Sequence, residues 1–333
     1  MPVTDGCKPA GNRTGTCWPG PGETEIVSTR PLLTEGEDMK RNTKKLLFAL
    51  GLILPAFAML CLTIITPLIN IIWMSFHDYS LLNIKNIKWN DFKNYTVLFG
   101  EKEFWNSFVR TIVYVAVTVA AQFVLGMAVA LLLNRKFPGR NLMRGLIFLP
   151  WTIPTLIVAV IWMWIMQPQY GVLNYILRSL GLITQNVNWL SSTKTAMASV
   201  IVAAVWRQLP FMMVMLLAGL QTVPQDLIEA AVIDGAGKGQ VFANITLPSI
   251  MSVIKTVTLT AIIGNFQMFT LFYNMTAGGP VRATTTLTVY TYETAFMSYD
   301  LGKGAAIGVV WMIFLIGFGT LYNRRLSRTE FYG

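Results

Sequence analysis

The chain has little charge for its length. Only 13% of its 333 residues are charged and 54% are hydrophobic, whereas a typical soluble domain has about 25% charged residues. There is one histidine, which excludes a site with two histidine ligands, and the three cysteines do not indicate a disulfide framework. We find no grouping of nucleophile, base and acid, so we predict no catalytic site and no metal site. The composition predicts a multi-span membrane protein.

A phosphate-binding loop is also missing. Such a loop needs a glycine, four residues, and then Gly-Lys-Ser or Gly-Lys-Thr. Gly-Lys-Gly occurs at 237–239 and at 302–304, but Val232 and Met297 stand where the first glycine is needed, and the hydroxyl residue is absent from both. We therefore expect this chain to bind neither ATP nor another cofactor, and we expect ATP hydrolysis elsewhere.

Six apolar runs meet or approach the roughly 20 residues that a helix needs to cross a bilayer. They are Leu46–Phe76, Val109–Leu133, Leu146–Met166, Ala196–Leu220, Thr256–Tyr273 and Ala305–Tyr322. None contains Asp or Glu. Carriers coupled to protons or cations usually place carboxylates in their spans, so this absence disfavours a secondary transporter, although Na⁺ held by backbone carbonyls would escape the test. We predict an all-α polytopic membrane protein with about six transmembrane helices, Pro150 and Pro154 kinking the third.

Basic residues predict the orientation, because Lys and Arg near span ends stay in the cytoplasm. They cluster before the first run, between the second and third, and after the sixth: Lys40, Arg41, Lys44 and Lys45; Arg135, Lys136, Arg140 and Arg144; Arg324, Arg325 and Arg328. Both termini and the polar gap at about 222–252 are then cytoplasmic, although the mixed charges of loop 77–108 weaken this signal. The net charge of +10 reflects this topology, so we expect a lipid bilayer and no nucleic acid as partner. We predict that residues 1–39 form a flexible cytoplasmic tail and that residues 40–333 form the transmembrane domain.

The polar gap holds the sequence EAAVIDGA at Glu229–Ala236. Pro224 can open a helix without losing a needed backbone bond, and Gly235 has the backbone freedom to end it and turn. A second short helix can follow and end at Pro248, which lacks an N–H. The segment predicts two short helices forming a surface that receives force from a partner.

These residues resemble the EAA loop of the permeases of binding-protein-dependent ABC importers. The pattern E-A-A-x-x-D-G-A, a Phe, an Ile and L-P is met by Glu229, Ala230, Ala231, Asp234, Gly235, Ala236, Phe242, Ile245, Leu247 and Pro248. The stretch Met275–Pro280, with Thr286, Leu287, Tyr290, Tyr292, Ala295 and Phe296, is similar to the last external loop of the carbohydrate branch, the maltose and glycerol-phosphate type. With Leu54, Pro55, Pro67, Ser75 and Phe76 of the first run, the resemblance extends from about Leu46 to the C-terminus. Gly239 and Ser252 depart from the pattern, so we expect a looser second helix.

The resemblance implies a type I ABC importer permease in the cytoplasmic (inner) membrane of a bacterium or archaeon. Its partners would be a second, related permease, two cytoplasmic subunits that bind ATP and Mg, and an external solute-binding protein that delivers an oligosaccharide or related sugar. Glu229 would pair with a basic residue of the ATPase, Asp234 and Gly235 would set the angle between the helices, and Phe242 would anchor the second helix. A secondary sugar transporter is the alternative.

Two features mark candidates for the substrate path. Asn265, Gln267, Phe269 and Tyr273 bring amides and aromatic rings into the fifth run. The spacing of four from Asn265 through Phe269 to Tyr273 predicts one helical stripe, suited to sugar contact or to helix–helix packing. Arg207 lies mid-run, where an unpaired arginine costs about 2.5–3.5 kcal/mol. It would either face the cavity and pair with an anionic saccharide, or bind carbonyls freed by Pro210.

Overall fold

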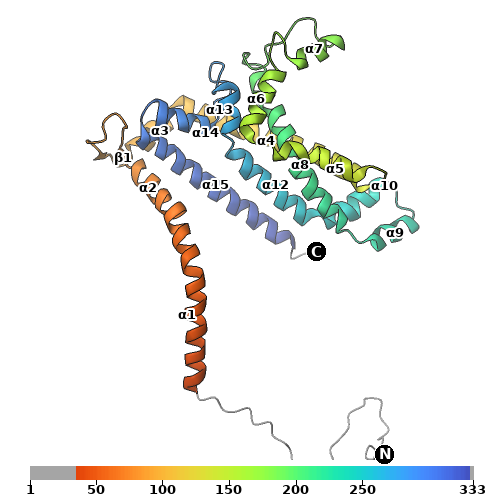
Figure 1. Cartoon of the computed structure of the whole chain (residues 1–333), viewed down its shortest axis with the longest axis horizontal. Helices are drawn as coiled ribbons and strands as arrows, with labels where there is room; N and C mark the ends of the chain where they lie inside the picture. Colours follow the sequence, from red (N-terminus) through yellow and green to blue (C-terminus); the bar gives the residue numbers. More distant parts are fainter. Residues whose placement is uncertain (1–34, 331–333) are drawn as a thin grey trace, which may run out of the picture. The chain divides into compact units, whose positions relative to one another are not determined.

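The computed structural model describes residues 35–330 (Figure 1). The predicted tail therefore lies mostly outside the described residues, and the first helix begins within its last part, at Glu35. The chain divides into two units, residues 1–65 and 66–333.

The described part of the first unit, from residue 35, is helical throughout. Helix α1 runs from Glu35 to Leu60 and passes into a five-residue π-helix, Cys61–Ile65. Its apolar side chains from Leu47 onward are exposed. With α2 (Thr66–Ser75) these residues form a candidate span, Leu47–Ser75, which confirms the first predicted run.

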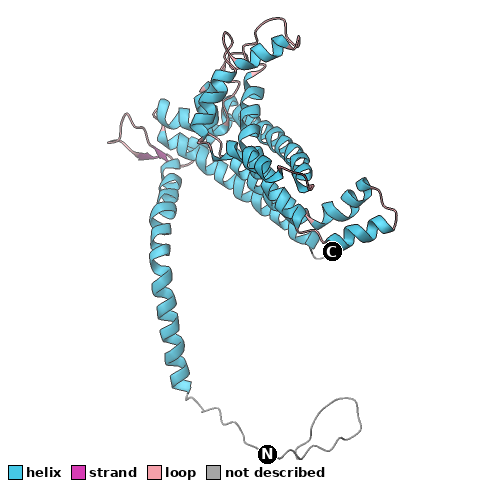
Figure 2. Ribbon diagram, turned by 45° about the vertical axis from the view of Figure 1, so that its right-hand side comes forward, coloured by secondary structure: helices cyan, strands magenta, loops and turns pink. Residues whose placement is uncertain are grey.

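The second unit is also helical apart from two short paired strands, as Figure 2 shows. After α2 its elements are β1 His77–Asp78, β2 Lys88–Trp89, α3 Lys93–Gly100, α4 Lys102–Asn134, α5 Arg140–Thr152, α6 Thr155–Ile165, α7 Val172–Ser179, α8 Ala196–Gln221, α9 Gln225–Ile233 and α10 Lys238–Val241. A π-helix Phe242–Thr246 follows, then α11 Leu247–Ser249, α12 Met251–Phe266, α13 Thr270–Thr276, α14 Leu287–Tyr292, a π-helix Glu293–Met297 and α15 Leu301–Glu330.

Helices α4 and α8 form the centre of this unit and pack along much of their length. Gly126 makes this possible, because a Cβ built there would lie 2.8 Å from Cγ of Met212. Small residues of this kind let membrane helices approach closely where no hydrophobic effect drives them together. Helix α12 packs against both α4 and α8, and α15 packs against α2.

The third predicted span is broken, because helices α5 and α6 meet at an angle of 98°. A second bend, of 68° between the helical segment Lys238–Ser249 and α12, lies just before the fifth predicted run. Within residues 35–330, four helices are long and apolar enough to cross a membrane by themselves, and up to six spans result if each bent pair is one span. The first bend lies between Pro150 and Pro154, as predicted, because Pro154 donates no backbone hydrogen bond and caps α6.

The fifth predicted span has different limits from those expected. The helix ends at Phe266, and residues 270–276 form the separate helix α13, so the run Thr256–Tyr273 is not continuous. Leu271, Phe272 and Met275 of α13 are buried in a core that α4, α6 and α8 share. Packing of this apolar face, rather than a helix-breaking residue, accounts for the change of direction.

The two ends of the second unit differ in structure. Helices α9 and α10 lie at the end where α8 stops and α12 begins, which we call the loop end, and α3, α7 and α13 lie towards the opposite end (Figure 1). At the opposite end Glu101 accepts hydrogen bonds from Lys303 of α15 and Tyr290 of α14. Other ion pairs here join Arg282 to Glu103 at 3.7 Å and to Glu293 at 3.4 Å.

Candidate functional site

The loop end carries a helix–turn–helix built from the EAAVIDGA segment. Pro224 precedes α9 in an extended conformation, with φ −60° and ψ 129°, and so serves as its N-cap. Asp226 lies in the first turn, where a carboxylate is favoured by the helix dipole. Glu229, Ala230 and Ala231 occupy the middle of α9, and Glu229 is exposed.

The turn after α9 depends on Gly235. Its φ is +84°, a value that residues with a side chain rarely adopt. The Gly235 N–H donates to the Val232 carbonyl at 3.1 Å, and the Ala236 N–H donates to the Ala231 carbonyl at 2.9 Å. This pair of bonds satisfies the last carbonyls of the helix in a Schellman motif. The Asp234–Gly235 turn predicted from the sequence is therefore confirmed.

The second helix of the loop contains a π-helical turn. Helix α10 begins after Gly237, whose N–H donates to Gln240 Oε1 at 2.8 Å. The π-helix Phe242–Thr246 follows and leads into α11. Pro248 lies inside this element rather than ending it as predicted, and the chain bends two residues later at Ile250. A local π-turn accommodates a proline that lacks an N–H, which explains the difference.

One face of this helix–turn–helix is anchored to the spans. Val223, Val241 and Ile250 are buried in a cluster with residues of α4 and α8. Ile228 of α9 and Phe242 pack against the same cluster. The loop therefore contacts these two spans directly through buried side chains.

Outside this contact, α9 exposes apolar side chains around much of its circumference. Leu227 is 50% exposed, Val232 59% and Ile233 85%. They accompany the exposed carboxylates of Glu229 and Asp234. A surface with large apolar residues beside charged ones, held on an anchored support, is typical of a protein–protein contact.

A cavity with an apolar and a polar side lies between the spans. Its volume is about 170 Å³, and residues of α4, α5, α8 and α12 line it. The lining residues are Gln122, Trp151, Gln208, Phe211, Met212, Thr260, Ala261, Gly264 and Asn265. The rings of Trp151 and Phe211 stack with centroids 5.9 Å apart. Amides and a hydroxyl beside aromatic rings are the groups that bind sugar hydroxyls and sugar faces.

Asn265 organises the polar side of the cavity. Its Oδ1 accepts a 2.9 Å hydrogen bond from the Tyr114 hydroxyl, and its Nδ2 donates to Gln122 Oε1 at 3.3 Å and to the Ala261 carbonyl at 2.8 Å. Gln122 Nε2 is buried and has no acceptor among the described residues. A buried donor without a partner is costly, so this amide is positioned to bind a guest molecule in the cavity.

Arg207 lies next to Gln208 on α8 but is not one of the residues that line the cavity. Its Nε is buried without an acceptor among the described residues, and its charge lies within electrostatic range of Tyr114. Among those residues, no hydrogen bond joins its guanidinium to carbonyls beside Pro210, and α8 continues through that proline. The geometry therefore gives no support to the interpretation based on Pro210.

The other predicted substrate-path residues do not share a stripe with Asn265, because the helix ends at Phe266. Gln267 is exposed in the break between α12 and α13. Phe269 and Tyr273 stack at 5.1 Å and pack with Tyr292 of α14, at 5.0 and 4.8 Å. The prediction of one stripe is wrong: the structure has a buried amide site and a separate aromatic cluster.

Sequence reasoning missed several residues of the cavity. Gln122 and Gln208 were the most accessible to prediction, because amides inside apolar runs are rare and usually have a purpose. Trp151 and Phe211 were not predicted, since aromatic residues are common in spans and a Trp near a span end more often belongs to the interfacial belt. Tyr292 contacts Phe269 only in the folded chain, so no local sequence signal links the two residues.

Comparison with known proteins identifies the family. Residues 122–328 match the family described as the inner membrane component of binding-protein-dependent transport systems. The chain is 35% identical over 274 residues to the trehalose/maltose transport system permease protein MalF of Thermococcus litoralis, covering 81% of this chain and 90% of that protein. It is 34% identical over 284 residues to the sulfoquinovosyl glycerol transport system permease protein SmoG of Agrobacterium fabrum, covering 85% of this chain and 91% of the relative.

The fold is similar to that of a solved transporter. A chain of the bacterial alginate ABC transporter, in complex with alginate pentasaccharide-bound periplasmic protein, superposes with a TM-score of 0.74 at 22% identity. The match covers 88% of this chain and 97% of that chain. This confirms the predicted all-helical type I importer fold. The chain is a multi-pass inner membrane protein that belongs to the family of permease components of binding-protein-dependent ABC importers.

Proposed function

We propose that this permease forms part of the translocation path for an oligosaccharide and that its loop 222–252 receives the motion of a cytoplasmic ATPase subunit. The observation that carries the proposal is the two-faced loop: Phe242 and Ile250 pack on the spans, while Leu227, Val232 and Ile233 are exposed. An anchored element with a free apolar face transmits force from whatever binds that face.

The partner at the loop is an ATPase that binds ATP and Mg. The exposed side chains of α9 would enter a groove of that subunit, with Glu229 paired to a basic residue there. ATP-driven closure of two ATPase subunits would move this loop and its counterpart on a second, related permease. The spans would then change from an inward-open to an outward-open state.

The orientation follows from this coupling. The loop end faces the cytoplasm, where ATP is, and both chain termini lie on the same side. The opposite end receives an external solute-binding protein. The family description, which names dependence on a binding protein, supports this part.

The substrate class is supported by the relatives and by the cavity. Relatives are named for trehalose or maltose, for sulfoquinovosyl glycerol and for diacetylchitobiose. The cavity presents Gln122, Gln208 and Asn265 beside two stacked rings, which suits a sugar. Arg207 does not line this cavity, but its charge beside Gln208 would favour an anionic substrate such as an oligosaccharide that carries carboxylates.

Copurification tests the proposed coupling. The tagged full chain, purified in mild detergent from its native membrane, should bring with it an ATPase subunit and a second permease. Glu229→Ala should weaken recovery of the ATPase, while Lys194→Ala at the opposite end should not. Alanine is a good helix former, so α9 should remain intact. Full recovery of the ATPase with Glu229→Ala would contradict the role of Glu229.

Uptake of paired substrates tests the role of Arg207. In Arg207→Gln, uptake of an oligosaccharide with carboxylate groups should fall far more than uptake of its neutral counterpart, and Arg207→Lys should retain part of the difference. An equal fall for both sugars would contradict a substrate-binding role.

A further inference from the structure

Helix α7 exposes part of its apolar side. It lies in the chain between the third and fourth predicted spans, at the end of the second unit opposite the Glu229 loop (Figure 1). Val172 is 56% exposed, Tyr175 74% and Ile176 46%. Its fully buried residue is the polar Asn174. Leu173 packs against the core and Leu177 is half-buried, so α7 uses only part of its apolar side to pack on its own protein.

The outward face is fixed by the hydrogen bonds of Asn174. Its Nδ2 donates to the carbonyls of Pro168 and Val187, and its Oδ1 accepts from the Val187 N–H and from Trp189 Nε1 at 2.9 Å. These bonds join both ends of the loop to the inner face of α7. The helix therefore cannot rotate its apolar side inward without breaking them.

The exposed face continues an apolar surface of the third span. Ile157, Val160 and Trp164 of α6 are exposed, as expected for a helix that faces lipid. Tyr170 is exposed beyond the end of α6, and after α7 the chain exposes Leu180 and Leu182. Exposed apolar residues are thus present both on the span and along the loop.

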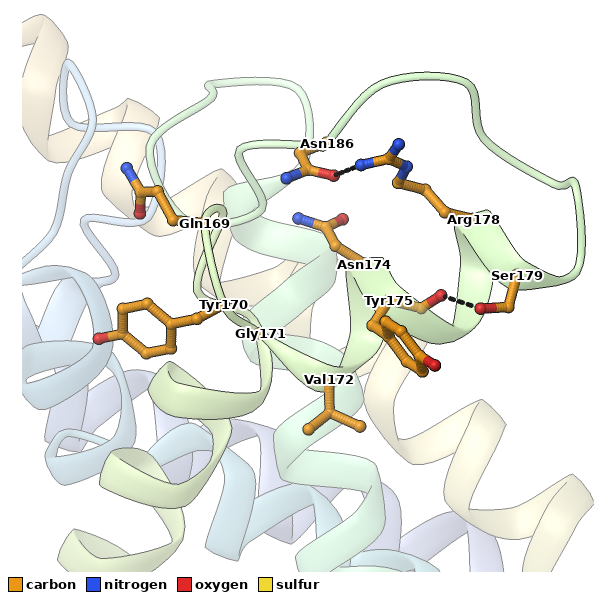
Figure 3. Close-up of a pocket in the computed structure, with 9 residues that line it drawn as sticks. All are labelled: Gln169, Tyr170, Gly171, Val172, Asn174, Tyr175, Arg178, Ser179 and Asn186. Atoms are coloured by element: carbon orange, nitrogen blue, oxygen red, sulfur yellow. Dashed lines mark hydrogen bonds between the residues drawn. The ribbon is translucent and has the colours of Figure 1, made fainter.

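Polar groups of the same loop line a concave surface of about 600 Å³ beside this apolar face (Figure 3). Arg178 donates to Asn186 Oδ1 at 3.4 Å, which uses one of its five N–H donors. Tyr170 and Tyr175 also line this surface. An arginine and two tyrosines next to apolar residues match the chemistry of the membrane interface, where tyrosine rings lie at headgroup level and arginine binds phosphate.

We propose that α7 and the following residues to Leu182 lie in the membrane interface and bind a phospholipid of the leaflet opposite the Glu229 loop. The apolar side chains enter the boundary between headgroups and acyl chains, and Arg178 binds the lipid phosphate. The loop between the third and fourth spans is thereby held at a fixed depth. The exposed apolar residues of the preceding helix α6 and the charge of Arg178 favour lipid over a protein partner.

Spin-label accessibility in vesicles of phosphatidylethanolamine and phosphatidylglycerol tests the proposal. A label is placed at Ile176 or Leu180 of the full chain, after Cys7, Cys17 and Cys61 have been replaced, and the chain is reconstituted with the subunits that copurify with it. Oxygen collects in lipid and a nickel chelate stays in water. The ratio of oxygen to nickel collisions should be several-fold higher at both positions than at Gln185, an exposed residue of the same loop.

Two results would overturn the proposal. Nickel collisions as frequent as at Gln185 would place the face in water, and exclusion of both reagents would show that a protein covers it. Arg178→Gln should reduce the ratio at Ile176, because the helix loses its phosphate contact. An unchanged ratio in this variant would overturn the assignment of Arg178. The measurement does not depend on transport, so its failure is distinct from failure of the proposed function.

Discussion

The Tyr114 hydroxyl donates a 2.9 Å hydrogen bond to Asn265 Oδ1, joining α4 to α12 across 151 positions of sequence. Both residues are buried, with 1% and 2% of their surface exposed. The same asparagine holds Gln122 through its Nδ2. The bond therefore fixes the amide groups that line the cavity and links two spans that also contact the loop end.

Tyr114→Phe should lower the free energy of unfolding by about 0.6–1.7 kcal/mol, the range for hydrogen bonds between membrane helices. The ring contact with Phe272, at 4.7 Å, should remain. Unfolding in detergent measures the effect, with Tyr175→Phe, at an exposed position, as the matched control. Equal stability of the two variants would show that the bond contributes nothing.

Gly235→Ala should destabilise the loop by about 1–2 kcal/mol, because φ is +84° there and a Cβ is unfavourable in that region. No atom lies within 4 Å of the added Cβ, so the cost is conformational and not steric. Gly239→Ala is the matched control, since it also meets no atom within 4 Å and lies in α10 with no positive φ. It should be neutral or stabilising. Hydrogen exchange of α9 and α10 in each variant distinguishes the outcomes, and equal protection would contradict the prediction.

Ile233→Ser should leave stability nearly unchanged while weakening association with the ATPase. The side chain is 85% exposed, so its removal costs the folded chain little, but a docked partner would lose apolar contact. Val281→Ser is the control, because Val281 is 89% exposed at the opposite end. ATPase recovered per permease is the measurement. Equal recovery in both variants would remove Ile233 from the interface.

Glu101 should make stability depend on pH. Burial by itself would raise the pKa of Glu101, but hydrogen bonds from Lys303 and Tyr290 outweigh it and hold this pKa below its usual value. The stabilisation is therefore fully present above the unfolded pKa of about 4.3 and is lost as pH falls through the lower folded pKa.

Glu101→Gln should accordingly reduce stability at neutral pH and flatten the acid loss below about pH 4. Unfolding across this range is the measurement. In a Lys303→Met background the same substitution should have a smaller effect, because one of the stabilising hydrogen bonds is already gone. An acid loss identical in wild type and Glu101→Gln would contradict the assignment.

The sequence predicted local features well and long-range ones poorly. The turn at Gly235 and the bend between Pro150 and Pro154 depend on the backbone chemistry of glycine and proline, which is local. The end of α12 at Phe266 depends on burial of Leu271 and Phe272 against distant helices, so periodicity extended the helix too far. Pairing of Asn265 with Tyr114 had no local signal, and only the fold brings the two residues together.

The most direct test of the central claim is uptake by vesicles that contain the copurified complex, with a labelled oligosaccharide and its binding protein outside and ATP inside. We predict uptake that requires ATP and the binding protein, and that persists when the Na⁺ and proton gradients are collapsed. Uptake driven by either gradient without ATP would contradict the account and make the chain an ion-coupled carrier.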